Sequence, residues 1–237
     1  MVPGPNAVLG GIHGGRVLDV ATGAGWFVTY LADGLADHDE IVGIDSDPAK
    51  GAAFAEATGG RPRIRFEVRD ASATGYPDAS FDTVAVANSL HHFADPATVL
   101  REMRRVLRAG GSLIVFEMYR DSQEPAQMTH VELHHWWAAI DSRSGMTHRS
   151  TYLRQELLDL VETLALADLQ VADVSNPEDD PLDPASIEEM REVIDRYLGR
   201  ADGDPELTAR GEALRRRLEA VGIRGATSVC IVGRKLA

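Results

Sequence analysis

Short apolar runs alternate with amphipathic stretches along the first half of the chain. The apolar runs predict five strands, at residues 16–20, 40–45, 64–68, 82–87 and 112–116. Residues 26–35 have the apolar spacing of a helix, and Asp47-Pro48 and Asp95-Pro96 are typical starts of two more helices. Strands that alternate with helices in this way predict a parallel sheet with helices on both faces.

The second half of the chain departs from this alternation. Residues 118–149 are rich in His, Trp and Met, and the Asp/Pro-rich stretch 176–184 is typical of a loop. The remaining segments predict helices at 151–166, 185–198 and 205–221, and strands at 167–174 and 227–232. We expect the last strand to return antiparallel at the edge of the sheet.

Together these elements predict an α/β fold of the Rossmann-like, doubly wound kind. Its sheet would have seven mostly parallel strands with an antiparallel last strand, and helical insertions would cap it. We expect a single domain over residues 1–237. Its core would comprise residues 15–117, 150–175 and 225–237, and its cap insertions residues 118–149 and 176–224.

Polar side chains that could bind a ligand or take part in a reaction lie at or just after the predicted strand ends. They are Asp19, Asp45, Asp70, Asn88 and Glu117. Parallel sheets bind ligands beyond the carboxyl ends of their strands. The sequence therefore predicts a binding site at one edge of the sheet.

A glycine-rich loop follows the first predicted strand. Gly23 and Gly25 allow the backbone to approach a ligand closely, and the helix that follows offers free N–H groups. The dinucleotide pattern G-x-G-x-x-G would need a glycine where Val28 stands, so the loop alone is a weak signal. Asp45 strengthens it, because an acid at the end of the second strand can accept hydrogen bonds from both ribose hydroxyls. Its alternative role is that of a turn or cap residue.

Several motifs in order now point to a family. They are LDVATGAGW, GIDSDP, Arg69-Asp70-Ala71, NSLHHF from Asn88, and LREMRRVLRAGGSLIVFE. From about Gly15 to Glu117 the chain resembles the class I S-adenosylmethionine-dependent methyltransferases. The resemblance is to the small-molecule branch that includes the ubiquinone/menaquinone-type C-methyltransferases. Ala21 stands where that family usually has glycine, which we expect to be tolerated with a negative φ at Ala21.

The resemblance implies roles for individual residues in a single methyltransferase domain. Ala21, Gly23 and Gly25 would line the methionine and ribose parts of S-adenosylmethionine, and Asp19 would lie near the methionine ammonium. The remaining cofactor residues would be Asp45 and Ser46 at the ribose, Asp70 and Ala71 at the adenine, and the Asn88 carbonyl near the methionine.

Methyl transfer from a sulfonium is an in-line displacement, so the protein mainly aligns the nucleophile with the methyl group. A general base is needed only where the nucleophile carries a proton at neutral pH. The expected activity is methylation of a small-molecule acceptor, with S-adenosylhomocysteine as the product. The alternatives are other chemistry on the same cofactor, non-catalytic binding, or an NAD-dependent oxidoreductase, which the missing third glycine disfavours.

Histidines are the candidates for acid–base chemistry. We single out His91, His92 and His134; the alternative is that one of the adjacent pair His91 and His92 only packs or caps the loop. Trp136 and Trp137 would form an apolar wall over the acceptor, and their alternative is burial without a functional role. His130 and His134 have the i, i+4 spacing of metal ligands on one helix face. Their set could be completed by His148, Glu117, Asp121 or Asp141. The alternative, which we favour from sequence, is that these histidines bond to neighbours and hold no metal.

Composition limits the expected partners and the expected cellular location of the protein. The 237 residues contain 24 Lys and Arg against 37 Asp and Glu, a formal net charge of −13 that disfavours nucleic acid and anionic membranes as partners. The single cysteine, Cys230, permits no intrachain disulfide and is typical of a buried strand in a cytoplasmic protein. The N-terminus lacks the basic region of a signal peptide, and no apolar run reaches the ~20 residues of a membrane span. We expect a small-molecule acceptor as partner, and a homodimer is left open.

Overall fold

A computed structural model describes residues 8–236 and shows one seven-stranded sheet. The strand order is β3-β2-β1-β4-β5-β7-β6. The strands are β1 (Arg16–Val20), β2 (Glu40–Asp45), β3 (Ile64–Val68), β4 (Phe81–Ala87), β5 (Leu107–Met118), β6 (Ala167–Val174) and β7 (Ser228–Arg234). The first five pair in parallel, and β7 runs antiparallel to both β5 and β6. The predicted Rossmann-like class and the antiparallel last strand are confirmed.

The prediction that the last strand lies at the edge is wrong. β7 lies between β5 and β6, and β6 forms the edge. Six of its seven residues are buried, Cys230 among them, whereas the middle of β6 is exposed. The apolar run of β7 fits an interior position, because an interior strand is covered on both faces.

The glycine pair Gly110-Gly111 lies within β5. The helix before this strand ends at Val106. A Cβ on Gly111 would come 2.6 Å from the Asp82 carbonyl oxygen of β4. Gly111 therefore allows β5 to run close beside β4.

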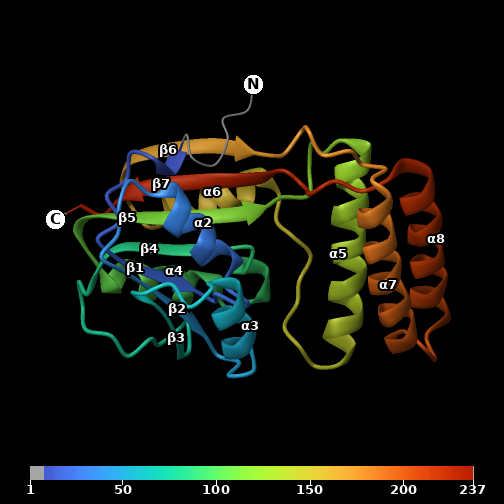
Figure 1. Cartoon of the computed structure of the whole chain (residues 1–237), viewed down its shortest axis with the longest axis horizontal. Coiled ribbons are helices and arrows are strands. Elements are labelled where there is room, and N and C mark those ends of the chain that lie inside the picture. Colours follow the sequence, from blue (N-terminus) through green and yellow to red (C-terminus); the bar gives the residue numbers. More distant parts are fainter. Residues whose placement is uncertain (1–7, 237) are drawn as a thin grey trace.

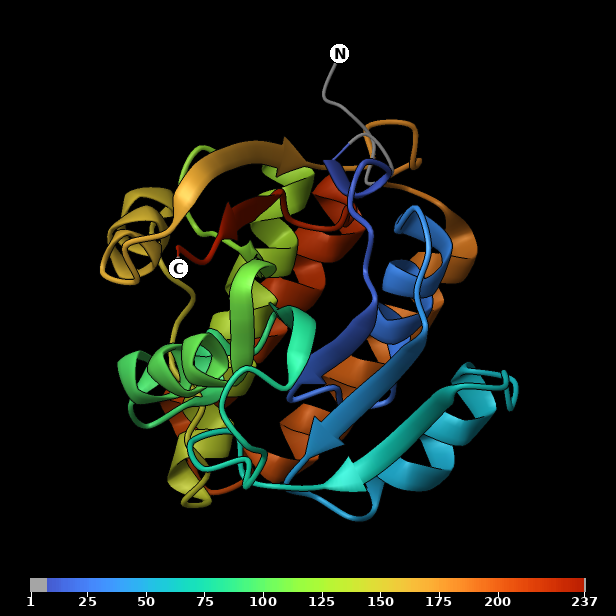
Figure 2. The same cartoon turned by 90° about the vertical axis from the view of Figure 1, so that its left-hand side faces the viewer.

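Four helices cover the two faces of the sheet (Figure 2). They are α2 (Trp26–Gly34), α3 (Lys50–Ala57), α4 (Pro96–Val106) and α6 (Arg154–Glu162). Alternate strand residues point to opposite faces, so Leu18 packs with the apolar residues of α4 and α6, and Val17 with those of α2 and α3. Asp95 begins α4 as predicted, since its side chain accepts from the Thr98 N–H.

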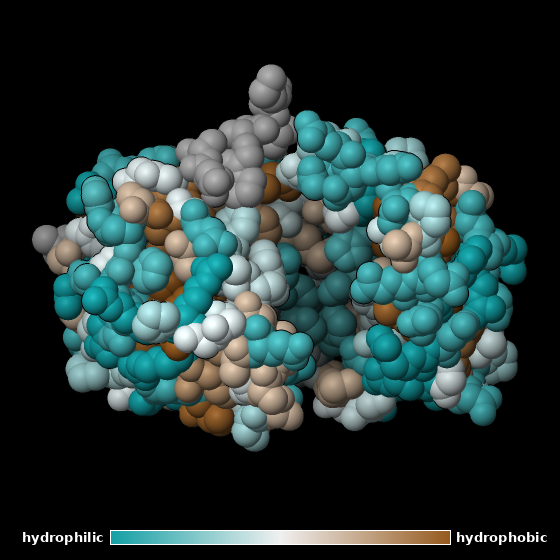
Figure 3. All heavy atoms as spheres, viewed as in Figure 1, coloured by the Kyte–Doolittle hydropathy of each residue, from teal (hydrophilic) through white to brown (hydrophobic). Residues whose placement is uncertain are grey.

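Three further helices form a bundle beside the sheet (Figure 1). They are α5 (Pro125–Arg143), α7 (Pro184–Arg200) and α8 (Pro205–Val221). They share a separate apolar core in which Trp136, Ile194 and Leu218 are fully buried. The bundle faces the carboxyl ends of β4 and β5, and a hollow lies between the two parts (Figure 3). The segments expected as cap insertions thus supply this bundle.

Candidate cofactor and acceptor site

The glycine loop leaves β1 and turns back over β2. The Thr22 N–H donates to the Ile44 carbonyl at 2.8 Å, and Gly23 and Gly25 have φ of 54° and 87°. A Cβ on Gly23 would meet nothing within 4 Å, while one on Gly25 would come 2.9 Å from the Phe54 ring. Gly23 therefore leaves open space for a ligand, and Gly25 allows α3 to pack against the loop.

Ala21 corrects one expectation. Its φ is 55°, not negative, so an alanine occupies the left-handed region that favours glycine. Its Cβ then approaches its own carbonyl group, which costs about 1–2 kcal/mol. The loop geometry is set by the hydrogen bonds of its neighbours, and Ala21 accepts that geometry with strain.

Asp45 connects the second strand to the glycine loop. Its Oδ2 accepts from the Gly23 N–H at 2.9 Å, and its Oδ1 accepts from the Asp47 N–H at 2.9 Å. Both bonds hold the carboxylate in a fixed orientation at the strand end. Asp45 lines the adjoining pocket, where it can accept from ribose hydroxyls.

Asp19 is a buried acid beneath the same loop. It is 1% exposed, and neither of its carboxylate oxygens has a hydrogen-bond partner within residues 8–236. Burial raises the pKa of Asp19 to about 7; the nearby Thr22 side chain partly opposes this shift and the charge of Asp45 adds to it. An ammonium group would satisfy a buried carboxylate of this kind, so the chemistry of Asp19 fits the methionine end of S-adenosylmethionine, and this role stays a prediction.

A pocket of about 460 Å³ extends from the loop along the strand ends. The cofactor residues predicted from sequence that line it are Ala21, Asp45, Ser46, Asp70 and Ala71. The lining residues that the sequence did not single out for it are Arg69, Ser72, Phe93, Ala94, Asp95, Thr98 and Val99. Arg69 and Phe93 lie inside quoted motifs and the others lie within two residues of one, and this proximity is the sequence signal for them. His92 closes the same pocket on the side of the bundle.

Two further predicted cofactor residues are held by local bonds. Asp70 Oδ1 accepts from the Ser72 N–H and hydroxyl, each at 2.7 Å, and these bonds lower the pKa of Asp70. Asn88 has a φ of 44°, and its Oδ1 accepts from the Met118 N–H at 2.9 Å. Asn88 thus braces β4 against β5, and the cofactor role of its carbonyl stays a prediction.

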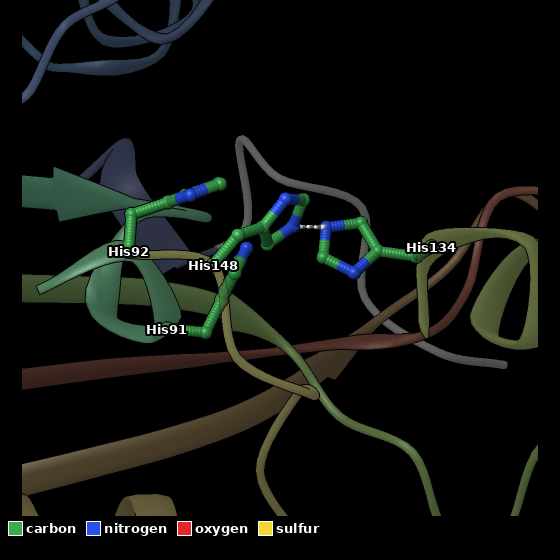
Figure 4. Close-up of side chains that lie close together, drawn as sticks. All are labelled: His91, His92, His134 and His148. Carbon is green, nitrogen blue, oxygen red and sulfur yellow. Dashed lines mark hydrogen bonds between the residues drawn. The ribbon is translucent and has the colours of Figure 1, made fainter. Parts of the chain in front are cut away.

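Four histidines meet between β4 and the bundle (Figure 4). This histidine cluster consists of His91, His92, His134 and His148, whose ligand nitrogens all lie within 4.8 Å of one another. They come from the short helix η1 (Leu90–His92), from α5 and from the loop after α5. Loss of solvent around the rings, together with the neighbouring imidazoles, lowers the pKa of His92 to about 3, although part of the His92 side chain stays exposed, and it also lowers the pKa values of His134 and His148.

The three predicted catalytic histidines are therefore brought together, but the predicted metal set is not. His130 lies outside the histidine cluster, where its Nδ1 accepts from the Ala226 N–H at 3.0 Å. Asp121 is also occupied elsewhere, since it accepts from the Arg154 N–H at 2.8 Å. The expected wall of tryptophans is wrong for Trp136, which is buried in the bundle and donates to the Leu207 carbonyl.

Two buried carboxylates stand behind the histidine cluster. Glu117 Oε1 lies 2.6 Å from His91 Nδ1, and its Oε2 accepts from the N–H groups of Ser89 and Leu90. Asp141 Oδ2 lies 2.7 Å from His148 Nδ1. The sequence singled out both acids as candidates for ligands, and the structure places them behind the imidazoles instead.

Known proteins resemble this chain in sequence over its first half. Residues 18–115 match the family model described as a methyltransferase domain. The chain is 46% identical over 103 residues to the demethylmenaquinone methyltransferase of Deinococcus radiodurans, which covers 43% of this chain and 42% of that protein. It is 36% identical over 108 residues to the ubiquinone/menaquinone biosynthesis C-methyltransferase UbiE of Geobacter sulfurreducens, covering 44% and 42%. The matches therefore span less than half the length of these relatives.

A solved structure resembles the chain over nearly its whole length. The phosphoethanolamine N-methyltransferase 2 of Haemonchus contortus, in complex with S-adenosyl-L-methionine, aligns with 98% of this chain and 52% of its own. The TM-score is 0.58 at 17% sequence identity, so this likeness shows the fold.

The parallel sheet and the glycine loop held by Asp45 define a Rossmann-like fold, and folds of this class typically bind nucleoside cofactors at their strand ends. Residues 18–115 match a methyltransferase domain, and the relatives that align with this part of the chain are named as methyltransferases. This part of the chain is therefore similar to a methyltransferase domain.

Proposed function

We propose that this chain transfers the methyl group of S-adenosylmethionine to a small-molecule acceptor and releases S-adenosylhomocysteine. The observation that carries the proposal is the Asp45 carboxylate, fixed by the Gly23 N–H at 2.9 Å and lining a pocket of about 460 Å³. This carboxylate is oriented before any ligand arrives, which lowers the entropic cost of binding.

Each end of the cofactor would meet a group of matching chemistry. Asp45 accepts from the ribose hydroxyls, and Asp70 accepts from the adenine amino group with Ala71 beside it. Asp19, which has no partner within residues 8–236, pairs with the methionine ammonium. The Asn88 carbonyl and Ser46 complete the site as the family resemblance implies.

The reaction depends on alignment more than on acid–base strength. The cofactor supplies an activated methyl group on a positively charged sulfur. The chain then holds the acceptor in line with that methyl group and excludes water from the pocket. His92 lines the pocket and belongs to the histidine cluster, so its neutral imidazole is the one placed to contact the acceptor.

The acceptor would enter through the hollow between the sheet and the bundle (Figure 3). Demethylmenaquinol-type acceptors are the first to test, because the Deinococcus radiodurans relative is named for demethylmenaquinone. The family match ends at residue 115, before the bundle begins, so the bundle of this chain sets its own acceptor preference.

Methyl transfer is tested with radiolabelled S-adenosylmethionine and a panel of quinols, phenols and amines. We expect label in one acceptor, S-adenosylhomocysteine in equal amount, and cofactor binding by calorimetry. Folded protein that binds neither S-adenosylmethionine nor S-adenosylhomocysteine would contradict both the proposed cofactor and the proposed methyl transfer. Cofactor binding without methylation of any acceptor in the panel would favour the alternatives, which are other chemistry on the cofactor or binding alone.

We also propose a cytoplasmic location and a working unit without nucleic acid or membrane, either alone or as a homodimer. The supporting observations are the net charge of −13 and the single cysteine. Within residues 8–236, none of the helices combines the length and apolar character that crossing a bilayer requires.

A further inference from the structure

The histidine cluster leaves polar atoms unsatisfied. Nε2 of His91 is buried and has no hydrogen-bond partner in the described part of the chain. Nε2 of His134 and Nε2 of His148 lie 3.3 Å apart and face each other (Figure 4). A proton on His134 Nε2 can be donated to His148 Nε2, but this hydrogen bond leaves His91 Nε2 without a partner. Hydrogen bonds among the imidazoles alone therefore do not account for the arrangement, since a buried polar group without a partner is costly.

Glu117 and Asp141 determine which ring nitrogen of His91 and of His148 carries the proton and which keeps a lone pair. An ionised carboxylate only accepts, so His91 Nδ1 donates to Glu117 and His148 Nδ1 donates to Asp141. In a neutral imidazole this leaves a lone pair on Nε2, and both Nε2 atoms point into the histidine cluster. A carboxylate behind a histidine is the usual support of a metal-ligating imidazole.

The spacing also fits a metal ion. In a tetrahedral zinc site with Zn–N bonds of about 2.0–2.1 Å, neighbouring ligand nitrogens lie roughly 3.3 Å apart. The observed distance between His134 Nε2 and His148 Nε2 is 3.3 Å, and all four ligand nitrogens lie within 4.8 Å of one another. Small rotations of the side chains would close the wider pairs around one ion.

We propose that His91, His134 and His148 bind one Zn²⁺ ion, with His92 as the fourth and exchangeable ligand. An all-imidazole donor set suits Zn²⁺ and its first-row neighbours, and it does not suit Mg²⁺ or Ca²⁺, which prefer oxygen. Neutral imidazoles keep the lone pair that a metal needs.

His92 gives the ion access to the cofactor pocket. It is the exposed member of the histidine cluster, and it also lines the pocket of about 460 Å³. Three protein ligands with an exchangeable fourth position are typical of zinc that meets a substrate. Metal binding itself does not depend on the proposed methyl transfer, so the two are tested separately.

The test begins with the full chain, expressed without a histidine tag and stripped with a chelator. Calorimetric titration with Zn²⁺ is expected to show one tight equivalent, and Zn²⁺ is expected to raise the Tm of the cofactor-free protein. Replacement by Co²⁺ is expected to give the intense visible absorption of a tetrahedral nitrogen site. Wild-type protein that takes up no stoichiometric Zn²⁺ would overturn the proposal.

Variants locate the ion. His134→Gln and His148→Gln are expected to abolish the tight equivalent and the Co²⁺ bands, and Asp141→Asn is expected to weaken Zn²⁺ binding about 10–100-fold. The matched control is His130→Gln, on the same helix but outside the histidine cluster, which should bind Zn²⁺ as the wild type does.

Circular dichroism and the Tm without metal show whether each variant folds. Should His134→Gln or His148→Gln fail to fold, Asp141→Asn and the wild-type Co²⁺ spectrum carry the test. Tight binding that persists in folded His134→Gln and His148→Gln would place the ion elsewhere and overturn the proposal.

Discussion

The Asp45 carboxylate accepts a hydrogen bond from the Gly23 N–H at 2.9 Å, so the end of the second strand fixes the loop that follows the first. β1 and β2 are parallel neighbours, which brings both strand ends to the same edge. The sequence offered two roles for Asp45, ribose binding or a turn. The structure shows the turn role through Gly23 and Asp47, and ribose binding stays a prediction that the position of the same carboxylate in the pocket supports.

Asp45→Ala is expected to weaken S-adenosylhomocysteine binding by about 2–3 kcal/mol, through loss of charge-assisted bonds and release of the Gly23 N–H. Asp45→Asn keeps an acceptor oxygen for Gly23, so its loss should be smaller. Isothermal titration calorimetry measures both. Asp47→Ala is the control, since the Asp47 side chain accepts from the Ala49 N–H and does not line the pocket. An affinity unchanged in Asp45→Ala would leave Asp45 with the turn role alone.

Asp19→Asn is expected to make the cofactor-free protein more stable and the cofactor weaker in binding. The carboxylate is buried without a partner in residues 8–236, so replacing it with a neutral isostere removes a cost of about 2–4 kcal/mol at neutral pH. The same change removes the negative charge that would meet the methionine ammonium. Urea unfolding measures the first effect and calorimetry the second. A less stable Asp19→Asn would show that Asp19 has a stabilising partner when ionised.

The pH dependence of unfolding follows from the same group. The pKa of Asp19 is about 7 in the folded protein against an ordinary value of 3.8, so the folded state favours the protonated form. Its contribution is therefore complete below about pH 4 and is lost as the pH rises through about 7. The free energy of unfolding of the wild type should fall over this range more steeply than that of Asp19→Asn. Parallel profiles for the two proteins would contradict the assignment.

Ala21→Gly is expected to stabilise the protein. Ala21 has a φ of 55°, and glycine removes the strain of about 1–2 kcal/mol while adding about 0.5–1 kcal/mol of backbone entropy cost. The net gain should be several tenths of a kcal/mol up to about 1 kcal/mol, measured by urea unfolding. Ala24→Gly in the same loop is the control, because Ala24 has no positive φ and gains no relief from strain. Equal effects of the two changes would mean that Ala21 is not strained.

Most of the sheet could be predicted from sequence because its local signals agree. The strands at 16–20, 40–45, 64–68 and 167–174 have the predicted bounds, since each apolar run ends at a charged or turn residue. The place of β7 could not be predicted, because an apolar run shows that a strand is covered but not which strands lie beside it. Ala21 was misjudged for a related reason, since bonds from Thr22 and Gly23 to β2 set its φ.

The candidate site also has a part that the sequence predicts and a part that it does not. Cofactor residues follow strand ends, so topology alone places Asp45 and Asp70 on one pocket. The histidine cluster depends on tertiary packing, since His148 reaches His91 only because the loop after α5 folds back, with the Arg149 N–H donating to the His91 carbonyl. The i, i+4 spacing of His130 and His134 suggested a pair, but the two side chains have different surroundings: His130 meets Ala226, and His134 joins the histidine cluster.

Substitutions at Gly211 and Gly199 test how closely the helices of the bundle pack. A Cβ on Gly211 of α8 would clash with the Trp136 ring and come 2.7 Å from Leu198 Cδ2. Trp136 cannot move freely, because it is fully buried and donates to the Leu207 carbonyl at 2.8 Å. Gly211→Ala is therefore expected to destabilise the protein by about 1–3 kcal/mol, with a lower Tm and an altered near-ultraviolet circular dichroism spectrum.

Gly199→Ala in α7 is the matched control for Gly211→Ala. A Cβ there would meet nothing within 4 Å, so the better helix propensity of alanine should raise stability by about 0.5–1 kcal/mol. The two changes add the same methyl group to neighbouring helices, and only packing distinguishes them. A Gly211→Ala variant as stable as Gly199→Ala would show that α8 stands farther from Trp136 than the contacts of the bundle indicate.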